Sequence, residues 1–264
     1  MPRTVRTGYD NGMGSTRTVV IDPRFNGPPG SGNGGYACGT AAEQLGAVPA
    51  EVTLSTPPPT GVALDVVDVD GGIELRSGDV VVAQAGAWDG DVEVPAPPPP
   101  DALEAAAAAL DLDDYDAIHP FPTCFVCGPR RAEGDGLRIF PGPLDDGQTV
   151  AWRWVPSPTT ADDEGSVRVP ITWAALDCLS GMAWMAATDG SGSGDAVLGR
   201  LAARIERRPH VGEATVVAGW RRAQDGRKLH SGSAVWAATG ELLARAAATW
   251  IQLEPSQVEA FRAG

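Results

Sequence analysis

The sequence contains the same order of elements twice, and this repeat limits the folds open to the chain. A strand, an apolar helix and a long run of alternating strands are predicted over residues 18–90 and again over residues 136–264. The segments EVTLSTPPPTGVALDV and LAARIERRPHVGEATVV share a layout in which a strand meets a proline-containing bend before the next strand. The repeat favours two modules of about 100 to 130 residues, each of a usual size for one core, over a single large domain.

Local signals place the individual elements. Asn33 is predicted to cap a helix that runs to about Leu45 and ends at Gly46. Strands of the first unit are predicted at residues 18–22, 51–56, 62–69, 72–76 and 79–88. In the second unit an apolar helix is predicted at residues 171–187. The strands of that unit are predicted at residues 137–140, 149–155, 197–207, 213–222, 228–238 and 241–253.

Proline, glycine and alanine mark the segments outside the two units. Residues 1–17 have no clear periodicity and are predicted to form a flexible N-terminal arm. Residues 91–135 are predicted to be a Pro/Ala-rich linker with a short helix at 102–110, followed by the cysteine-containing connector HPFPTCFVCGP.

Charge and hydropathy exclude some classes of partner. With 20 basic and 34 acidic residues the formal net charge is -14, which repels phosphate backbones and argues against nucleic acid as a partner. A small anionic ligand is not excluded, because the basic residues form local clusters. The longest apolar stretch is too short to span a bilayer, so we expect no membrane partner and a cytoplasmic location.

Four cysteines are too few for a disulfide scaffold in 264 residues. Cys124 and Cys127 form a CFVC pair that suits zinc or redox chemistry, but zinc needs two more ligands and His119 is the one nearby candidate. The sequence therefore predicts no metal site here. The interpretation that replaces zinc binding is a tight connector with two reduced thiols. The role of Cys124 and Cys127 stays open at this point.

Asp177 is the candidate functional residue that stands out most. The run ITWAALDCLSGMAWMAA carries no other charge, so as a helix it must be buried nearly all round. An ionised carboxylate there costs several kcal/mol, by order of magnitude, unless it has partners. Either its lone pairs are satisfied across a helix seam, or it lies at a pocket wall where a desolvated carboxylate acts as a base.

A long apolar helix wrapped by an antiparallel sheet, twice in one chain, resembles the double hotdog proteins of the acyl-CoA thioesterase-like superfamily. The segments FNGPPGSGNGGYACG, CFVCGPRRAEGDGLRIFPGP and WAALDCLSGMAW carry the resemblance, which covers residues 18–253. It implies an α+β fold of two tandem hotdog units that form a pseudo-dimer, with an acyl thioester bound between the halves.

The same resemblance assigns roles to residues at the two helices. Asp177 is expected to be the catalytic carboxylate, which activates a water molecule or, as an alternative, attacks the thioester itself, and Asn33 is expected to orient the water or the substrate. Gly34 and Gly35 are expected to leave first-turn N–H groups open to the thioester carbonyl. The other residues expected to contact substrate are Tyr36, Thr172, Cys178, Ser180 and Gly181.

The resulting hypothesis is hydrolysis of an acyl-CoA or acyl-carrier-protein thioester, with no cofactor beyond the CoA thioester itself. Two alternatives stay open: a non-catalytic protein that binds acyl-CoA or an acyl chain, and a hotdog dehydratase or cyclase. Relatives of the last kind generally use a histidine, and neither predicted helix contains one. A homo-oligomer, such as a dimer, is compatible with the exposed strand edges that such sheets carry.

Overall fold

A computed structural model describes residues 17–46, 49–185, 195–254 and 256–257. The predicted arm at 1–17 lies outside this part except for Arg17, which begins the first strand. None of the described helices is both long and apolar enough to cross a membrane.

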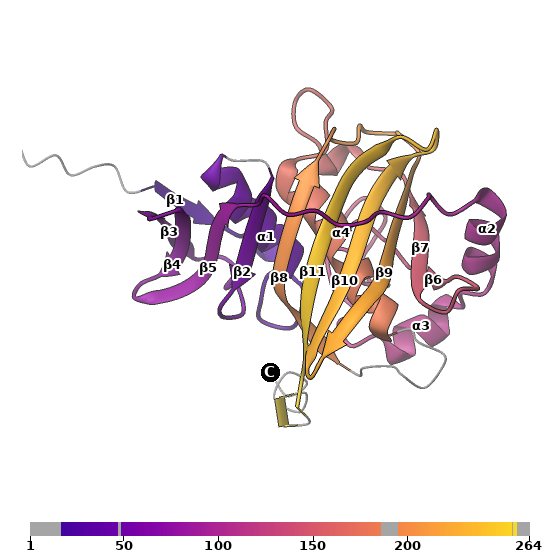
Figure 1. The fold of residues 1–264 in the computed structure, drawn as a ribbon, viewed down its shortest axis with the longest axis horizontal. Coiled ribbons are helices and arrows are strands. Elements are labelled where there is room, and N and C mark those ends of the chain that lie inside the picture. The colour runs from indigo at the N-terminus through magenta and orange to yellow at the C-terminus, as the bar shows by residue number, and fades with distance from the viewer. Residues whose placement is uncertain (1–16, 47–48, 186–194, 255, 258–264) are drawn as a thin grey trace, which may run out of the picture.

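Within these residues, the strands form one eleven-stranded antiparallel sheet (Figure 1). Its order is β1-β3-β4-β5-β2-β8-β11-β10-β9-β7-β6. Strands β2 and β8 are neighbours in the middle. Outward from them, β5, β4, β3 and β1 on one side correspond in order to β11, β10, β9 and β7 on the other. The strands are β1 (Arg17–Val20), β2 (Ala50–Leu54), β3 (Ala63–Val69), β4 (Gly72–Ser77), β5 (Val80–Ala87), β6 (Gly142–Pro143), β7 (Thr149–Trp154), β8 (Ala196–Ile205), β9 (Thr215–Asp225), β10 (Lys228–Ala237) and β11 (Leu242–Gln252).

Two helices lie on one face of this sheet, α1 (Gly34–Leu45) beside β2, β4 and β5 and α4 (Val169–Met185) beside β7 to β11 (Figure 1). The Asn33 side chain accepts a hydrogen bond from the Tyr36 N–H, which caps α1 as predicted. Gly46 ends α1 with a left-handed φ of 70°, and glycine adopts that conformation at little cost. Both helix predictions are thus confirmed within a few residues at each end, and residues 186–187 of the second lie outside the described part.

Glycines let α1 and α4 approach each other closely. A Cβ atom at Gly35 would lie 2.4 Å from the Asp177 Cβ, and one at Gly39 would lie 2.6 Å from the Pro170 Cα. The two glycines are four residues apart, so they lie on the same face of α1. Buried residues of both helices and of strands from both ends of the sheet belong to one continuous apolar core.

The linker is packed rather than free. Figure 1 shows residues 88–99 crossing the face of the sheet opposite α4 and leading to α2 (Pro100–Ala108) and α3 (Leu112–Ile118). Val92 and Leu103 are buried there against Trp220 and Trp236. Helix α3 was not predicted, since its sequence LDDYDAI is mostly acidic and only Tyr115 is buried.

The strand predicted at residues 137–140 is wrong. Leu137 and Ile139 alternate into the core as expected, but their N–H groups bond to the carbonyls of Phe125 and Val126 in the connector instead of to a sheet strand. Arg138 between them has φ of 52°, which breaks the extended backbone. The connector therefore lies under this segment and contributes Cys124, Phe125, Val126 and Cys127 to the core.

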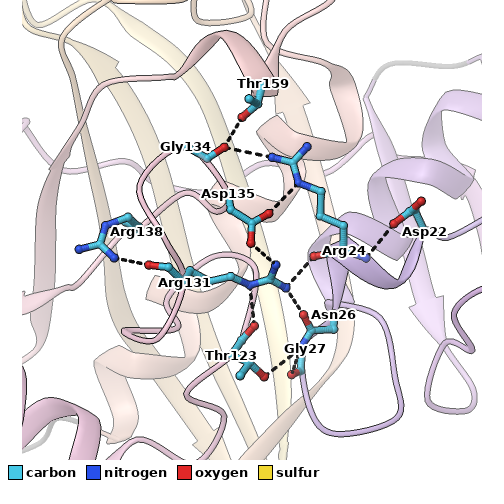
Figure 2. Close-up of polar contacts among 10 residues, drawn as sticks. All are labelled: Asp22, Arg24, Asn26, Gly27, Thr123, Arg131, Gly134, Asp135, Arg138 and Thr159. Atoms are coloured by element: carbon cyan, nitrogen blue, oxygen red, sulfur yellow. Dashed lines mark hydrogen bonds and ion pairs between the residues drawn. The ribbon is translucent and has the colours of Figure 1, made fainter.

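A network of polar contacts holds the connector against the loop that precedes α1 (Figure 2). Arg131 donates to the carbonyls of Thr123 at 2.8 Å and Arg24 at 2.7 Å, and it also contacts the Asn26 side chain. Asp135 accepts from both Arg131 and Arg24, at 3.0 and 3.1 Å. Because Arg131 contacts the residue next to Cys124 and the loop that leads to Asn33, it fixes two segments of the candidate site together.

Candidate functional site

Asp177 lies in the middle of α4 and points at the N-terminus of α1. Its Oδ2 accepts hydrogen bonds from the Gly35 N–H at 2.8 Å and from the Asn33 Nδ2 at 3.0 Å. The first N–H groups of a helix have no partner inside the helix and carry partial positive charge, so a carboxylate is stabilised there. The side chain is only 2% exposed, and these contacts partly offset the cost of burying it.

The second carboxyl oxygen is the exceptional atom of the site. Asp177 Oδ1 is buried and has no hydrogen-bond partner among the residues that the structure describes. Burial raises the pKa of Asp177 to about 7, the bonds from Gly35 and Asn33 oppose this rise, and the charge of Cys124 adds to it. A buried carboxyl group with one anchored oxygen and one free oxygen has the arrangement of a proton acceptor.

The two ends of the Asn33 side-chain amide make different contacts. Its Oδ1 accepts from the Tyr36 N–H at 2.9 Å as the helix cap, and this bond requires Nδ2 to face Asp177. The same Nδ2 lies 3.7 Å from the Cys178 Sγ and 3.9 Å from the Cys124 Sγ. Asn33 thus links the carboxyl group, the helix start and two thiols.

A pocket of about 260 Å³ opens onto these groups. Of the residues expected to form the site, Asp177, Asn33, Gly34 and Cys178 line it. Apolar side chains make up much of the remaining wall, including Leu54, Phe121, Met182, Met185, Leu198 and Trp250. An apolar chamber with a few polar groups at one place is typical of a small-molecule site.

The other expected site residues lie behind the pocket wall. Tyr36 stacks on the Phe25 ring at 3.9 Å, and burial raises the pKa of its phenol to about 12. Ser180 donates to the Asp177 carbonyl at 2.6 Å and accepts from the Trp250 Nε1 at 2.8 Å. Neither Tyr36 nor Ser180 is among the residues that line the pocket.

Thr172 and Gly181 lie in α4 away from the pocket lining. The Thr172 hydroxyl donates to the Arg168 carbonyl at 3.4 Å. A Cβ atom at Gly181 would lie 2.6 Å from the Trp250 ring, so glycine lets the helix and β11 approach. Both positions therefore serve local packing of α4 in this structure.

The expectation that Gly35 presents an open N–H group is wrong, because that group is bonded to Asp177. The N–H of Gly34 has no acceptor among the described residues, and Gly34 lines the pocket. The first turn of α1 therefore offers one free donor to a ligand instead of two.

A cluster of three thiols lies beside the carboxyl group, and sequence reasoning did not find it. The Sγ atoms of Cys124, Cys127 and Cys178 all lie within 4.8 Å of one another, and all three residues line the pocket. The neighbouring thiols of Cys127 and Cys178 lower the pKa of Cys124, while that of Cys178 is raised by the same contacts and by burial. Cys178 joins the pair from α4, a contact that no spacing in the sequence indicates.

Comparison with known proteins bears on the fold. No protein-family model matches the sequence, and no curated protein matches it. Among solved structures, a protein from Novosphingobium aromaticivorans thought to be a thioesterase superposes with a TM-score of 0.56 at 16% identity, covering 90% of this chain and 95% of that one. The TesB protein of Mycobacterium avium subsp. paratuberculosis superposes with a TM-score of 0.52 at 14% identity, covering 90% and 92%. The predicted resemblance to hotdog proteins of the thioesterase superfamily is thus confirmed at the level of the fold.

Proposed function

We propose that this chain, which has the fold of the thioesterase superfamily, hydrolyses an acyl-CoA or acyl-carrier-protein thioester, with water activated by Asp177. The observation that carries the proposal is the free Oδ1 of Asp177 at the wall of an apolar pocket, while Oδ2 is held by Gly35 and Asn33. A carboxyl group serving only to join two helices would not need an orphaned oxygen beside a pocket.

The sheet order supports an arrangement of two tandem hotdog units. In this arrangement β2 of the first unit pairs with β8 of the second, and each unit wraps its sheet around one helix, α1 or α4. The pocket then takes walls from both units, with Leu54 from one and Leu198 from the other. The acyl group occupies the apolar chamber, because transfer of apolar surface from water drives its binding.

The chemistry follows from the positions of the polar groups. A water molecule bonded to Asp177 Oδ1 attacks the thioester carbonyl carbon and gives its proton to the carboxylate. The Gly34 N–H at the positive end of α1 stabilises the negative charge that develops on the carbonyl oxygen. When the C–S bond breaks, Asp177 returns the proton to the departing thiolate, which leaves the acid and the free thiol as products.

The test is the rate of thiol release from a panel of short, long and aromatic acyl-CoA thioesters. Asp177→Asn keeps the size of the side chain and an oxygen that accepts from Gly35, so we expect a folded protein. Its kcat/KM should fall at least about a hundredfold, the scale of a lost general base. Asp79→Asn is the matched control, since it makes the same change at an exposed turn between β4 and β5.

Two outcomes would contradict the proposal. Undiminished turnover by Asp177→Asn would exclude the carboxyl group as the base. No turnover by the native protein with any thioester, together with thermal stabilisation by an acyl-CoA, would show a binding protein. The two bonds that Asp177 makes across the helix seam are compatible with both candidates, since they stabilise the seam in either case.

A further inference from the structure

We infer that Cys124, Cys127 and Cys178 form a binding site for Zn²⁺ or a similar thiophilic divalent ion, with the fourth coordination position open to the pocket. The three Sγ atoms lie within 4.8 Å of one another, and those of Cys124 and Cys178 are 3.8 Å apart. In tetrahedral zinc sites the Zn–S distance is about 2.3 Å, which places two ligand sulfurs about 3.8 Å apart. One pair of sulfurs therefore already has the spacing that the ion requires, and the third sulfur lies within 4.8 Å of both.

The backbone of the connector is shaped to present two of these sulfurs together. The Gly128 N–H donates to the Cys124 carbonyl at 2.9 Å, which closes the turn that carries Cys124 and Cys127. A Cβ atom at Gly128 would lie 2.5 Å from the Cys124 N, so the turn requires glycine. A C-x-x-C turn of this kind directs both side chains to one point.

The surroundings favour an ion over three neutral thiols. The Asn33 Nδ2 lies within 3.9 Å of the Sγ atoms of both Cys124 and Cys178 and is a donor to these sulfurs. All three cysteines are buried free thiols, and their sulfur atoms lie next to one another. A divalent cation replaces the thiol protons, which pass to the buffer.

The fourth ligand is a molecule in the pocket. His119 also lines the pocket, but its Nδ1 accepts from the Phe121 N–H at 3.0 Å, which leaves the ring proton on Nε2 and removes that nitrogen as a ligand. Because all three cysteines line the pocket, an ion between them is accessible from it. Three protein ligands with an open position distinguish such a site from a closed structural one.

The experiment measures Zn²⁺ bound to the reduced full-length protein by native mass spectrometry and by competition with a chromophoric chelator. We expect one ion per chain and, with Co²⁺ alone, the absorption of thiolate-to-metal charge transfer. Cys178→Ser should weaken Zn²⁺ binding at least about a hundredfold, since loss of partners outside the first shell already costs ten- to a hundredfold. Cys38→Ala is the control, because Cys38 is a buried cysteine of α1 outside the cluster.

A readout on the native protein covers the case in which a serine variant fails to fold. Bound Zn²⁺ should protect Cys124, Cys127 and Cys178 from alkylation, as measured residue by residue in peptide maps, and should leave the rate at Cys38 unchanged. The inference is overturned if the native protein binds no ion, if Cys178→Ser binds as tightly as the native protein, or if Zn²⁺ leaves all four alkylation rates unchanged. None of these measurements depends on thioester turnover, so the metal site and the proposed hydrolase stand or fall separately.

Discussion

Replacing Gly35 by alanine is expected to disrupt the contact between α1 and α4. The new Cβ would lie 2.4 Å from the Asp177 Cβ, 2.8 Å from the Trp173 carbonyl oxygen and 3.0 Å from the Ala174 Cα. Ordinary van der Waals contact begins at 3.4 Å, so the helices must separate by about 1 Å at this point. Two of the three atoms are backbone, and α4 is buried against the sheet, so neither can move aside without moving the helix.

The expected loss of stability combines two costs and one gain. Overpacking of a close-packed core costs about 1 to 3 kcal/mol. Stretching the 2.8 Å bond between the Gly35 N–H and Asp177 removes a hydrogen bond to a charged group, at about 1.5 to 3 kcal/mol. Alanine gains up to about 1 kcal/mol of helix propensity over glycine. The free energy of unfolding should therefore fall by about 1.5 to 5 kcal/mol.

Urea unfolding followed by tryptophan fluorescence measures this change, with Gly34→Ala as the matched control. Gly34 is the neighbouring residue of the same turn, and a Cβ there meets Leu198 at 3.0 Å and Leu54 at 3.4 Å, contacts made by side-chain atoms alone. Since the propensity gain is the same, the difference between the two variants reports the backbone clash together with the stretched bond to Asp177. Equal stability of Gly35→Ala and Gly34→Ala would refute the reasoning.

Two further predictions concern the contacts that hold the loops. Arg131→Ala leaves the carbonyls of Thr123 and Arg24 without their donor and should lower the free energy of unfolding by about 1 to 3 kcal/mol; Arg131→Lys should recover little, because an ammonium group lacks the planar fork, and full recovery would contradict this. The Arg207 guanidinium lowers the pKa of Glu213, so this pair adds stability above the usual glutamate pKa of 4.5 that is lost as the pH falls through the lower folded value. The stability difference between the native protein and Glu213→Gln, measured by thermal unfolding, should therefore shrink from pH 7 to pH 3, and a constant difference would contradict the pairing.

Much of the fold was predictable because its signals are local. The Asn33 cap, Gly46 and the unbroken apolar run around Asp177 each specify an element within a few residues, and the structure has those elements. The segment at 137–140 shows the limit of such signals. Its alternating apolar residues indicate that one side of the segment is buried. They do not indicate that its backbone bonds to the connector instead of to a strand of the sheet.

The same limit applies to the candidate site, where local signals predicted some residues and long-range contacts were not predictable. Asp177 was identifiable because a lone charge in an apolar helix requires a partner, and Asn33 because a helix start requires a cap. The sequence does not indicate that the partner of Asp177 is the first turn of α1, because the two helices are more than a hundred residues apart in the chain. The position of Cys178 was likewise not predictable. It joins Cys124 and Cys127 in the three-thiol cluster, and the sequence indicated a pair of Cys124 and Cys127 alone.

The bond between Asp177 on α4 and Gly35 on α1 joins two helices of one polypeptide. In an assembly of separate chains, such a composite site falls apart on dilution, since its halves meet only by collision. Here the covalent connection holds the halves at a fixed, high effective concentration. Under the proposed function, the turnover per molecule should therefore stay the same from micromolar to picomolar solutions, because α1 and α4 contribute different groups to the site within one chain.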